Sequence, residues 1–190
     1  MTAMTTGSEP APELRHRTIA AGEARVAVFT RTYDAPVEDV WDACTNPERL
    51  ARWYVPVTGE LREGGRFEQA MMGGGTIARC EAPHHLRLVL GDGGADEIEL
   101  RLSPAAGGAT TLELQHATTL AEHEIGGQVY DAIFCMGGGY YPRLRALELH
   151  LRGTLPADYD TLTFYQREDM RPVIDRGSAA MQALLDAQPQ

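Results

Sequence analysis

The stretch DAPVEDVWDACTNPERLARWY, residues 34–54, decides the fold of this chain. Its apolar residues first recur at spacings of three, one and three, from Val37 to Cys44, which is one face of a short helix. The Asn46-Pro47 pair ends that helix, because a residue before proline avoids helical backbone angles. Proline fits the first turn of a helix, so the same pair begins a second short helix.

Strand patterns lie on both sides of this helical stretch. Before it, residues 18–33 predict two strands joined by a tight glycine turn. After Pro56, five stretches of alternating polar and apolar residues follow at intervals of about ten residues, which is typical of an antiparallel meander. They are RFEQAMM (66–72), TIARCE (76–81), LRLVL (86–90), EIELRLS (97–103) and TTLELQHATT (110–119). The glycines at 73–75 are expected to form a turn.

The last third of the chain predicts helices. Residues 127–136 form one helical pattern, the glycine run 137–139 is expected to interrupt it as a turn or hinge, and a second pattern continues to Leu151. From Met170 to Leu185 a further amphipathic pattern presents one apolar stripe. That stripe fits docking on its own domain, a homodimer contact, or a membrane or partner helix.

We therefore expect an α+β fold in which a curved antiparallel sheet wraps around a long C-terminal helix, with two short helices after the first strand. Residues 1–14 are expected to be a disordered tail, residues 15–153 the domain, and residues 154–190 a helical extension. A sheet covered by a single helix can enclose a cavity for a small molecule.

Composition excludes several function classes. All 17 basic residues are arginines, so no lysine is present for a Schiff base or a phosphate loop. The net charge of −10 disfavours binding to nucleic acid and to anionic membranes. Three cysteines, without paired spacing or an apolar leader segment, predict a reducing, cytoplasmic location.

An ordered set of motifs resembles the START-like (SRPBCC) superfamily, in the branch named after the heat-shock-protein-90 ATPase activator. The resemblance runs from about Arg15 to Arg152. Its matching positions are Pro36, Val40, Trp41, Pro47, Glu48, Leu50, Trp53, Gly64, Gly65, Phe67, Pro83, Leu86, Leu112, Leu114 and His116. It implies a helix-grip fold with an interior pocket, in a family whose members bind apolar ligands or cyclise polyketides.

The candidate ligand-binding residues come from the presumed inner sheet face and from the helices that cover it. They are Trp53, Phe67, Gln69, Met71, Leu88, Leu90, Leu100, Leu114, His116, Tyr130, Phe134, Tyr140, Tyr141 and Leu144. His116 fits either a buried histidine bonded to a carbonyl or a proton-transfer group. The tyrosines fit either packing at helix ends or hydroxyls that face a ligand. Gln69 is a polar residue on an apolar face, which indicates a wet cavity or a shifted register.

No catalytic residue is assigned, and no metal or cofactor is expected. His116, His123 and Glu124 lack metal-site spacing, and Cys135 lacks a nearby cation to activate its thiol. The expected function is binding of an apolar, aromatic or polyketide-like small molecule, and cofactor-free cyclisation or dehydration of that molecule stays open. A co-chaperone-like interaction module and a resistance protein that sequesters a toxic metabolite are the alternatives.

Overall fold

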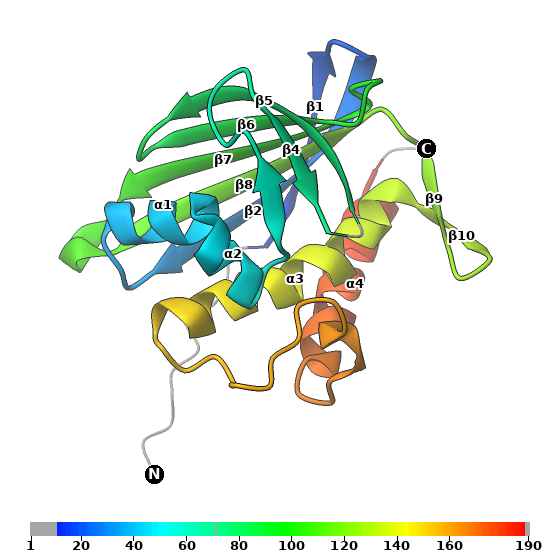
Figure 1. Cartoon of the computed structure of the whole chain (residues 1–190). Coiled ribbons are helices and arrows are strands. Elements are labelled where there is room, and N and C mark those ends of the chain that lie inside the picture. Colours follow the sequence, from blue (N-terminus) through cyan, green and yellow to red (C-terminus); the bar gives the residue numbers. More distant parts are fainter. Residues whose placement is uncertain (1–10, 71, 189–190) are drawn as a thin grey trace.

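An antiparallel sheet of eight strands curves around a long helix (Figure 1). The structure, a computed structural model, describes residues 11–70 and 72–188. The strands are β1 (Glu13–Ile19), β2 (Gly22–Tyr33), β3 (Val57–Gly59), β4 (Arg66–Gln69), β5 (Gly73–Glu81), β6 (His85–Leu90), β7 (Asp96–Pro104), β8 (Thr110–Thr118), β9 (Glu122–Ile125) and β10 (Gln128–Asp131). The helices are α1 (Val37–Thr45), α2 (Pro47–Trp53), α3 (Ala132–Leu151) and α4 (Arg171–Asp186), with single 3-10 turns η1 (Ala106–Gly108) and η2 (Phe164–Gln166).

The strand order in the sheet is β1-β2-β8-β7-β6-β5-β4-β3. Strands β4 to β8 form the predicted five-stranded meander, β3 adds an unpredicted strand beside β4, and β8 returns to pair with β2, so that Phe29 lies opposite Leu114 and Ala27 opposite His116. The β1–β2 hairpin is also present as predicted. These features confirm the expected α+β fold, with α1 and α2 following the first hairpin.

Helices α1 and α2 sit at one end of the sheet (Figure 1). The side chain of Asn46 accepts a hydrogen bond of 3.0 Å from the Glu48 N–H and thereby caps α2. The indole Nε1–H of Trp53 donates to the carbonyl oxygen of Ala43 at 2.9 Å. This bond ties the two helices together.

The predicted interruption of the long helix is wrong. Helix α3 begins after Asp131, whose carboxylate accepts the Ile133 N–H at 2.7 Å, and runs through the glycine run 137–139. A Cβ atom on Gly137 would lie 2.1 Å from the carbonyl oxygen of Gly177 in α4. The glycines therefore allow two helices to approach closely, which a pattern read along one helix does not reveal.

Two further expectations need correction. Gly73–Gly75 begins strand β5 and is not a turn. Glycine is needed at position 75 because a Cβ there would lie 2.1 Å from the carbonyl oxygen of Val89 on the adjacent strand. Residues 128–131 form β10 and not helix, and β10 pairs with β9 in a hairpin that extends from the domain (Figure 1). The sequence analysis did not predict this hairpin.

The ends of the chain fall as follows. Residues 1–10 lie outside the described residues, and Glu13 and Leu14 of the expected tail belong to β1. In the C-terminal extension, α4 packs against α3 on the side away from the sheet (Figure 1), and its Met181 is fully buried. The apolar stripe thus docks on its own domain. None of the helices in the described ranges has the length and apolar character needed to cross a membrane.

Candidate functional site

A cavity lies between the inner face of the sheet and helix α3. Its volume is about 130 Å³, counted as the space open to the centres of water molecules. It is lined by Cys44, Thr45, Leu50, Trp53, Tyr54, Val57, Leu61, Phe67, Gln69, Ile77, Cys80, Leu86, Leu88, Ile98, Leu100, Leu112, Leu114, Tyr140, Arg143, Leu144 and Leu147.

The sheet side of the cavity is apolar because the strand register aligns aliphatic side chains. Leu88 pairs with Ile98 across β6 and β7, and Leu100 pairs with Leu114 across β7 and β8. Paired residues in an antiparallel sheet project to the same face. The inward face is therefore a continuous aliphatic surface, which suits the ring or chain of an apolar ligand.

Five polar side chains interrupt this apolar lining: Thr45, whose hydroxyl donates to the carbonyl oxygen of Trp41, and Tyr54, Gln69, Tyr140 and Arg143. The Tyr54 hydroxyl donates to Oε1 of Gln69 at 3.3 Å, so the buried amide of Gln69 has a protein partner. Burial raises the pKa of Tyr54, although the charge of Arg143 and the hydrogen bond to Gln69 oppose the rise. Burial also raises the pKa of Tyr140 well above its ordinary value. Both phenols therefore stay protonated at neutral pH.

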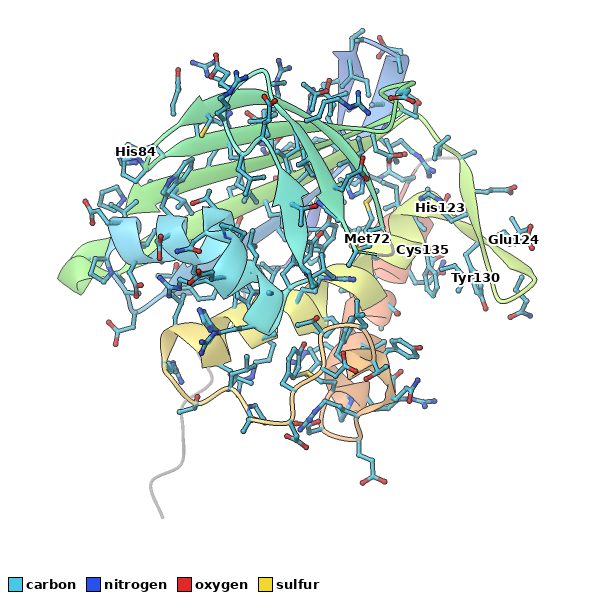
Figure 2. The ribbon with its side chains drawn as sticks, viewed as in Figure 1. Met72, His84, His123, Glu124, Tyr130 and Cys135 are labelled. Carbon is cyan, nitrogen blue, oxygen red and sulfur yellow. The ribbon has the colours of Figure 1, made fainter. Side chains whose placement is uncertain are left out.

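Arg143 is held by contacts that do not neutralise its charge. Its Nη1 donates to the carbonyl oxygen of Gly139 at 2.9 Å, and its Nη2 lies 3.6 Å from the sulfur of Met72, a residue labelled in Figure 2. The guanidinium carbon lies 5.5 Å from the ring centroid of Tyr54 and 5.0 Å from that of Phe164. These are cation–π distances, so aromatic faces take the place of a counter-ion.

A chain of hydrogen bonds leads from the cavity wall to a carboxylate. The Tyr140 hydroxyl lies 2.8 Å from Nδ1 of His116, and Nε2 of His116 lies 3.1 Å from Oδ1 of Asp96. Burial raises the pKa of Asp96, but hydrogen bonds from His116 and Thr118 outweigh burial and hold that pKa below its ordinary value. The ionised Asp96 accepts from Nε2–H of His116, and in this tautomer Nδ1 accepts from the Tyr140 hydroxyl.

The thiols near the cavity are protonated. Burial raises the pKa of Cys44 to about 12, although Arg49 opposes the rise. Burial and the charge of Glu63 raise the pKa of Cys80, and burial and Asp131 raise that of Cys135. Cys44 and Cys80 line the cavity whereas Cys135 does not. A protonated thiol is a poor nucleophile, so none of the three is prepared for covalent catalysis.

The cavity brings together only part of the predicted ligand-binding set. The predicted residues that line it are Trp53, Phe67, Gln69, Leu88, Leu100, Leu114, Tyr140 and Leu144. The ones that do not are Leu90, His116, Tyr130, Phe134 and Tyr141, and Met71 lies outside the described residues. His116 nonetheless reaches the cavity wall through Tyr140. The role of each residue in ligand binding stays a prediction.

The residues away from the cavity have other surroundings. Tyr130 lies on the β9–β10 hairpin (Figure 2) and stacks on Phe134 with ring centroids 5.8 Å apart. Tyr141 is buried against Phe29, and Arg31 lies over its ring. Leu90 is half-buried and packs against the apolar cluster around Phe67.

Sequence reasoning missed Tyr54 and Arg143. Arg143 follows Tyr140 by three residues, and on a helix that spacing places both side chains on one face. The same helical period that selected Tyr140 and Leu144 could have found it. Tyr54 follows α2 directly, and its orientation toward Gln69 depends on contacts that no sequence period reports. Within residues 11–70 and 72–188, no three His, Cys, Asp or Glu side chains are grouped to hold a metal ion.

Comparisons with known proteins agree with this architecture. The model of the Activator of Hsp90 ATPase homolog 1-like protein family matches residues 34–146. No curated protein matches the chain. CalU16 from Micromonospora echinospora is 34% identical in its crystal structure, which covers 93% of this chain and 98% of its own, with a TM-score of 0.72. Its solution structure is 35% identical over 96% of this chain and 98% of its own, with a TM-score of 0.76.

Two more distant structures share the fold. DynU16, described as a protein of the dynemicin biosynthetic locus, is 22% identical over 71% of this chain and 50% of its own, with a TM-score of 0.56. An HSP90 activator from Plasmodium falciparum is 19% identical over 67% of this chain and 96% of its own, with a TM-score of 0.57. The resemblance inferred from the motifs is thus confirmed, and the chain belongs to the Activator of Hsp90 ATPase homolog 1-like protein family.

Proposed function

We propose that this chain binds an apolar, aromatic or polyketide-like small molecule in the cavity between the sheet and α3. The observation that supports this most strongly is the chemistry of the lining, in which aliphatic and aromatic side chains surround a small number of polar groups. Small-molecule sites have this composition, because apolar walls supply affinity and a few polar groups set orientation.

The relatives support a natural-product setting. CalU16 shares more than a third of the aligned residues in its solution structure, and DynU16, a protein of the same fold, comes from the dynemicin biosynthetic locus. A carrier or a modifying protein for aromatic intermediates would need a cavity of this kind.

A matched pair of variants tests the proposal. Leu88 lines the cavity, whereas Val89 is the next residue of β6 and projects to the opposite face of the sheet. Native mass spectrometry of freshly purified protein detects a retained molecule, and naphthalene serves as a defined probe. We expect Leu88→Trp to fill the cavity and weaken naphthalene binding about tenfold or more, whereas Val89→Trp retains wild-type affinity.

Unchanged binding in Leu88→Trp would refute an interior site. The same pair separates the proposal from a co-chaperone role, because stimulation of a chaperone ATPase through the surface would not respond to a filled cavity. A sequestration role differs in stoichiometry, since a trapping protein holds one molecule in each site while excess molecule stays unaltered.

The hydrogen-bonded chain of Tyr140, His116 and Asp96 favours a second candidate function, cofactor-free cyclisation or dehydration of the bound molecule. Tyr140 lines the cavity, and its oxygen can take a proton from an acidic C–H or O–H of the ligand while its own hydroxyl proton passes to Nδ1 of His116, whose ring is paired with Asp96. His116→Ala should then abolish conversion of the retained molecule and leave naphthalene affinity intact. Full conversion by His116→Ala, followed by mass spectrometry, would leave binding as the function.

A further inference from the structure

The charge of the cavity is opposite in sign to that of the whole chain. The chain carries a net charge of −10. Among the described residues that line the cavity, no aspartate or glutamate is present, and Arg143 is the one charged side chain. An arginine keeps its proton at any physiological pH. A molecule that enters the cavity therefore meets a single, permanent positive charge.

Arg143 has hydrogen-bonding capacity to spare. Its Nη1 donates to the backbone and its Nη2 approaches the sulfur of Met72, a weak acceptor. Its Nε is buried and has no acceptor among the described residues, and no carboxylate in that part of the chain forms an ion pair with it. A guanidinium offers five N–H donors, so the present contacts leave some of them unused.

The cavity also offers an N–H donor from Gln69, whereas the hydroxyl proton of Tyr140 is already donated to Nδ1 of His116. Tyr54 donates to the amide oxygen of Gln69, which leaves the NH2 group of Gln69 able only to donate. Donors and a positive charge at one end of an apolar cavity complement an anionic oxygen group attached to an apolar body.

We infer that Arg143 is the anchor for an anionic oxygen group, and that the cavity prefers aromatic carboxylates over their neutral analogues. This inference rests on the proposed function, because it names the ligand class of the same cavity. Arginine binds carboxylates through paired N–H donors, and a charged hydrogen bond is stronger where walls of leucine exclude water. The ring of the ligand would lie along Leu100 and Leu114, with its carboxylate beside Arg143.

Three probes that share the naphthalene ring measure the preference of the cavity for an anionic group. They are 2-naphthoate, which is anionic, naphthalene-2-carboxamide, which is its neutral analogue, and naphthalene, which lacks a polar group. We expect the wild-type protein to bind 2-naphthoate about tenfold or more tightly than the carboxamide in titration calorimetry at neutral pH. Arg143→Met keeps an unbranched apolar stem in place of the arginine stem and removes the guanidinium and its charge, so it should abolish that preference and leave naphthalene binding within about threefold.

Arg145→Met is the matched control. Arg145 lies two residues away on α3, pairs with Glu148 and does not line the cavity, so its loss removes the same net charge at a distance. It should retain the full preference for 2-naphthoate. If Arg145→Met loses the preference as fully as Arg143→Met, a general field effect replaces the anchor and the inference is overturned.

The three probes also distinguish failure of the Arg143 anchor from failure of the proposed apolar site. Binding of all three probes with equal affinity by the wild-type protein overturns the anchor and leaves the apolar site standing. Failure of all three probes to bind overturns the proposed function itself. Because the wild-type comparison needs no variant, the inference stays testable even if Arg143→Met does not fold.

Discussion

The hydroxyl oxygen of Tyr140 and the Nδ1 atom of His116 lie 2.8 Å apart and join helix α3 to strand β8 at the edge of the cavity. The two rings meet edge to face, with centroids 5.7 Å apart. On its other side Tyr140 packs against Phe29, at a centroid distance of 5.2 Å. One tyrosine thus joins the sheet to the helix through both a hydrogen bond and aromatic packing.

Tyr140→Phe should lower the free energy of unfolding by about 1 kcal/mol, because it leaves Nδ1 of His116 half-buried without its partner while the packing on Phe29 persists. Urea denaturation measures the change. Tyr141→Phe is the control, since no hydrogen bond of the Tyr141 hydroxyl is seen in the described part of the chain. An equal loss in both variants would show that the bond to His116 contributes nothing specific.

Asp96→Asn should reduce stability at neutral pH by about 1 kcal/mol and have less effect in acid. The pKa of Asp96 lies below its ordinary value of 3.8 in the folded chain, because the bonds from His116 and Thr118 outweigh the effect of burial. A depressed pKa contributes stability above the unfolded pKa and loses it as the pH falls through the folded value.

The measurement is the free energy of unfolding of both proteins between neutral pH and about pH 3. The wild-type advantage should shrink below about pH 4, where the unfolded-state carboxyl begins to bind its proton. A difference that stays constant over the whole range would mean that Asp96 is not stabilised as a carboxylate.

Cys80 should be protected by an occupied cavity, whereas Cys135 should not. Both thiols are half-buried and both have raised pKa values, but only Cys80 lines the cavity. Saturating naphthalene should slow iodoacetamide labelling of Cys80 by about threefold or more, with site-specific rates read by mass spectrometry. Equal slowing at Cys135 would indicate a general tightening of the protein and not occupancy of this cavity.

The sequence predicted the sheet and the long helix because their signals are periodic and local. Leu112 and Leu114 alternate along one strand, and Tyr140, Leu144, Leu147 and Leu151 recur at the helical interval. The set of residues around the cavity was harder to predict, since it depends on which strands curve over α3. Tyr130 and Phe134 share the aromatic character of Tyr140, yet they lie on and beside the β9–β10 hairpin, away from the cavity.

The glycine run at 137–139 shows why local rules failed. Glycine lowers helix propensity, so a run of three predicts a break. The run instead lies inside α3, where Gly137 faces Gly177 of α4 across a contact too close for any side chain. Glycine is required at position 137 because of Gly177, which lies 40 residues later in the sequence. Only the packing of the two helices reveals this requirement.

Gly137→Ala tests that explanation. Its Cβ would lie 2.1 Å from the carbonyl oxygen of Gly177, and backbone cannot move aside as a flexible side chain can. The helices must separate, so the variant should lose about 2 kcal/mol of unfolding free energy. At Gly139 the nearest atom to an added Cβ is Nη1 of Arg143, at 3.4 Å. Gly139→Ala should therefore be neutral or stabilising by up to about 1 kcal/mol, because alanine is the better helix former.

Gly137→Ala and Gly139→Ala are the same chemical change at two positions within one turn of α3, and we expect their effects on stability to differ. Thermal and urea unfolding of both proteins decides between them. If helix propensity governed the glycine run, both variants would gain stability by the same amount. If close approach of α3 and α4 governs it, Gly137→Ala alone loses stability, and Gly177→Ala loses it too, since its Cβ would lie 2.4 Å from the carbonyl oxygen of Gly137.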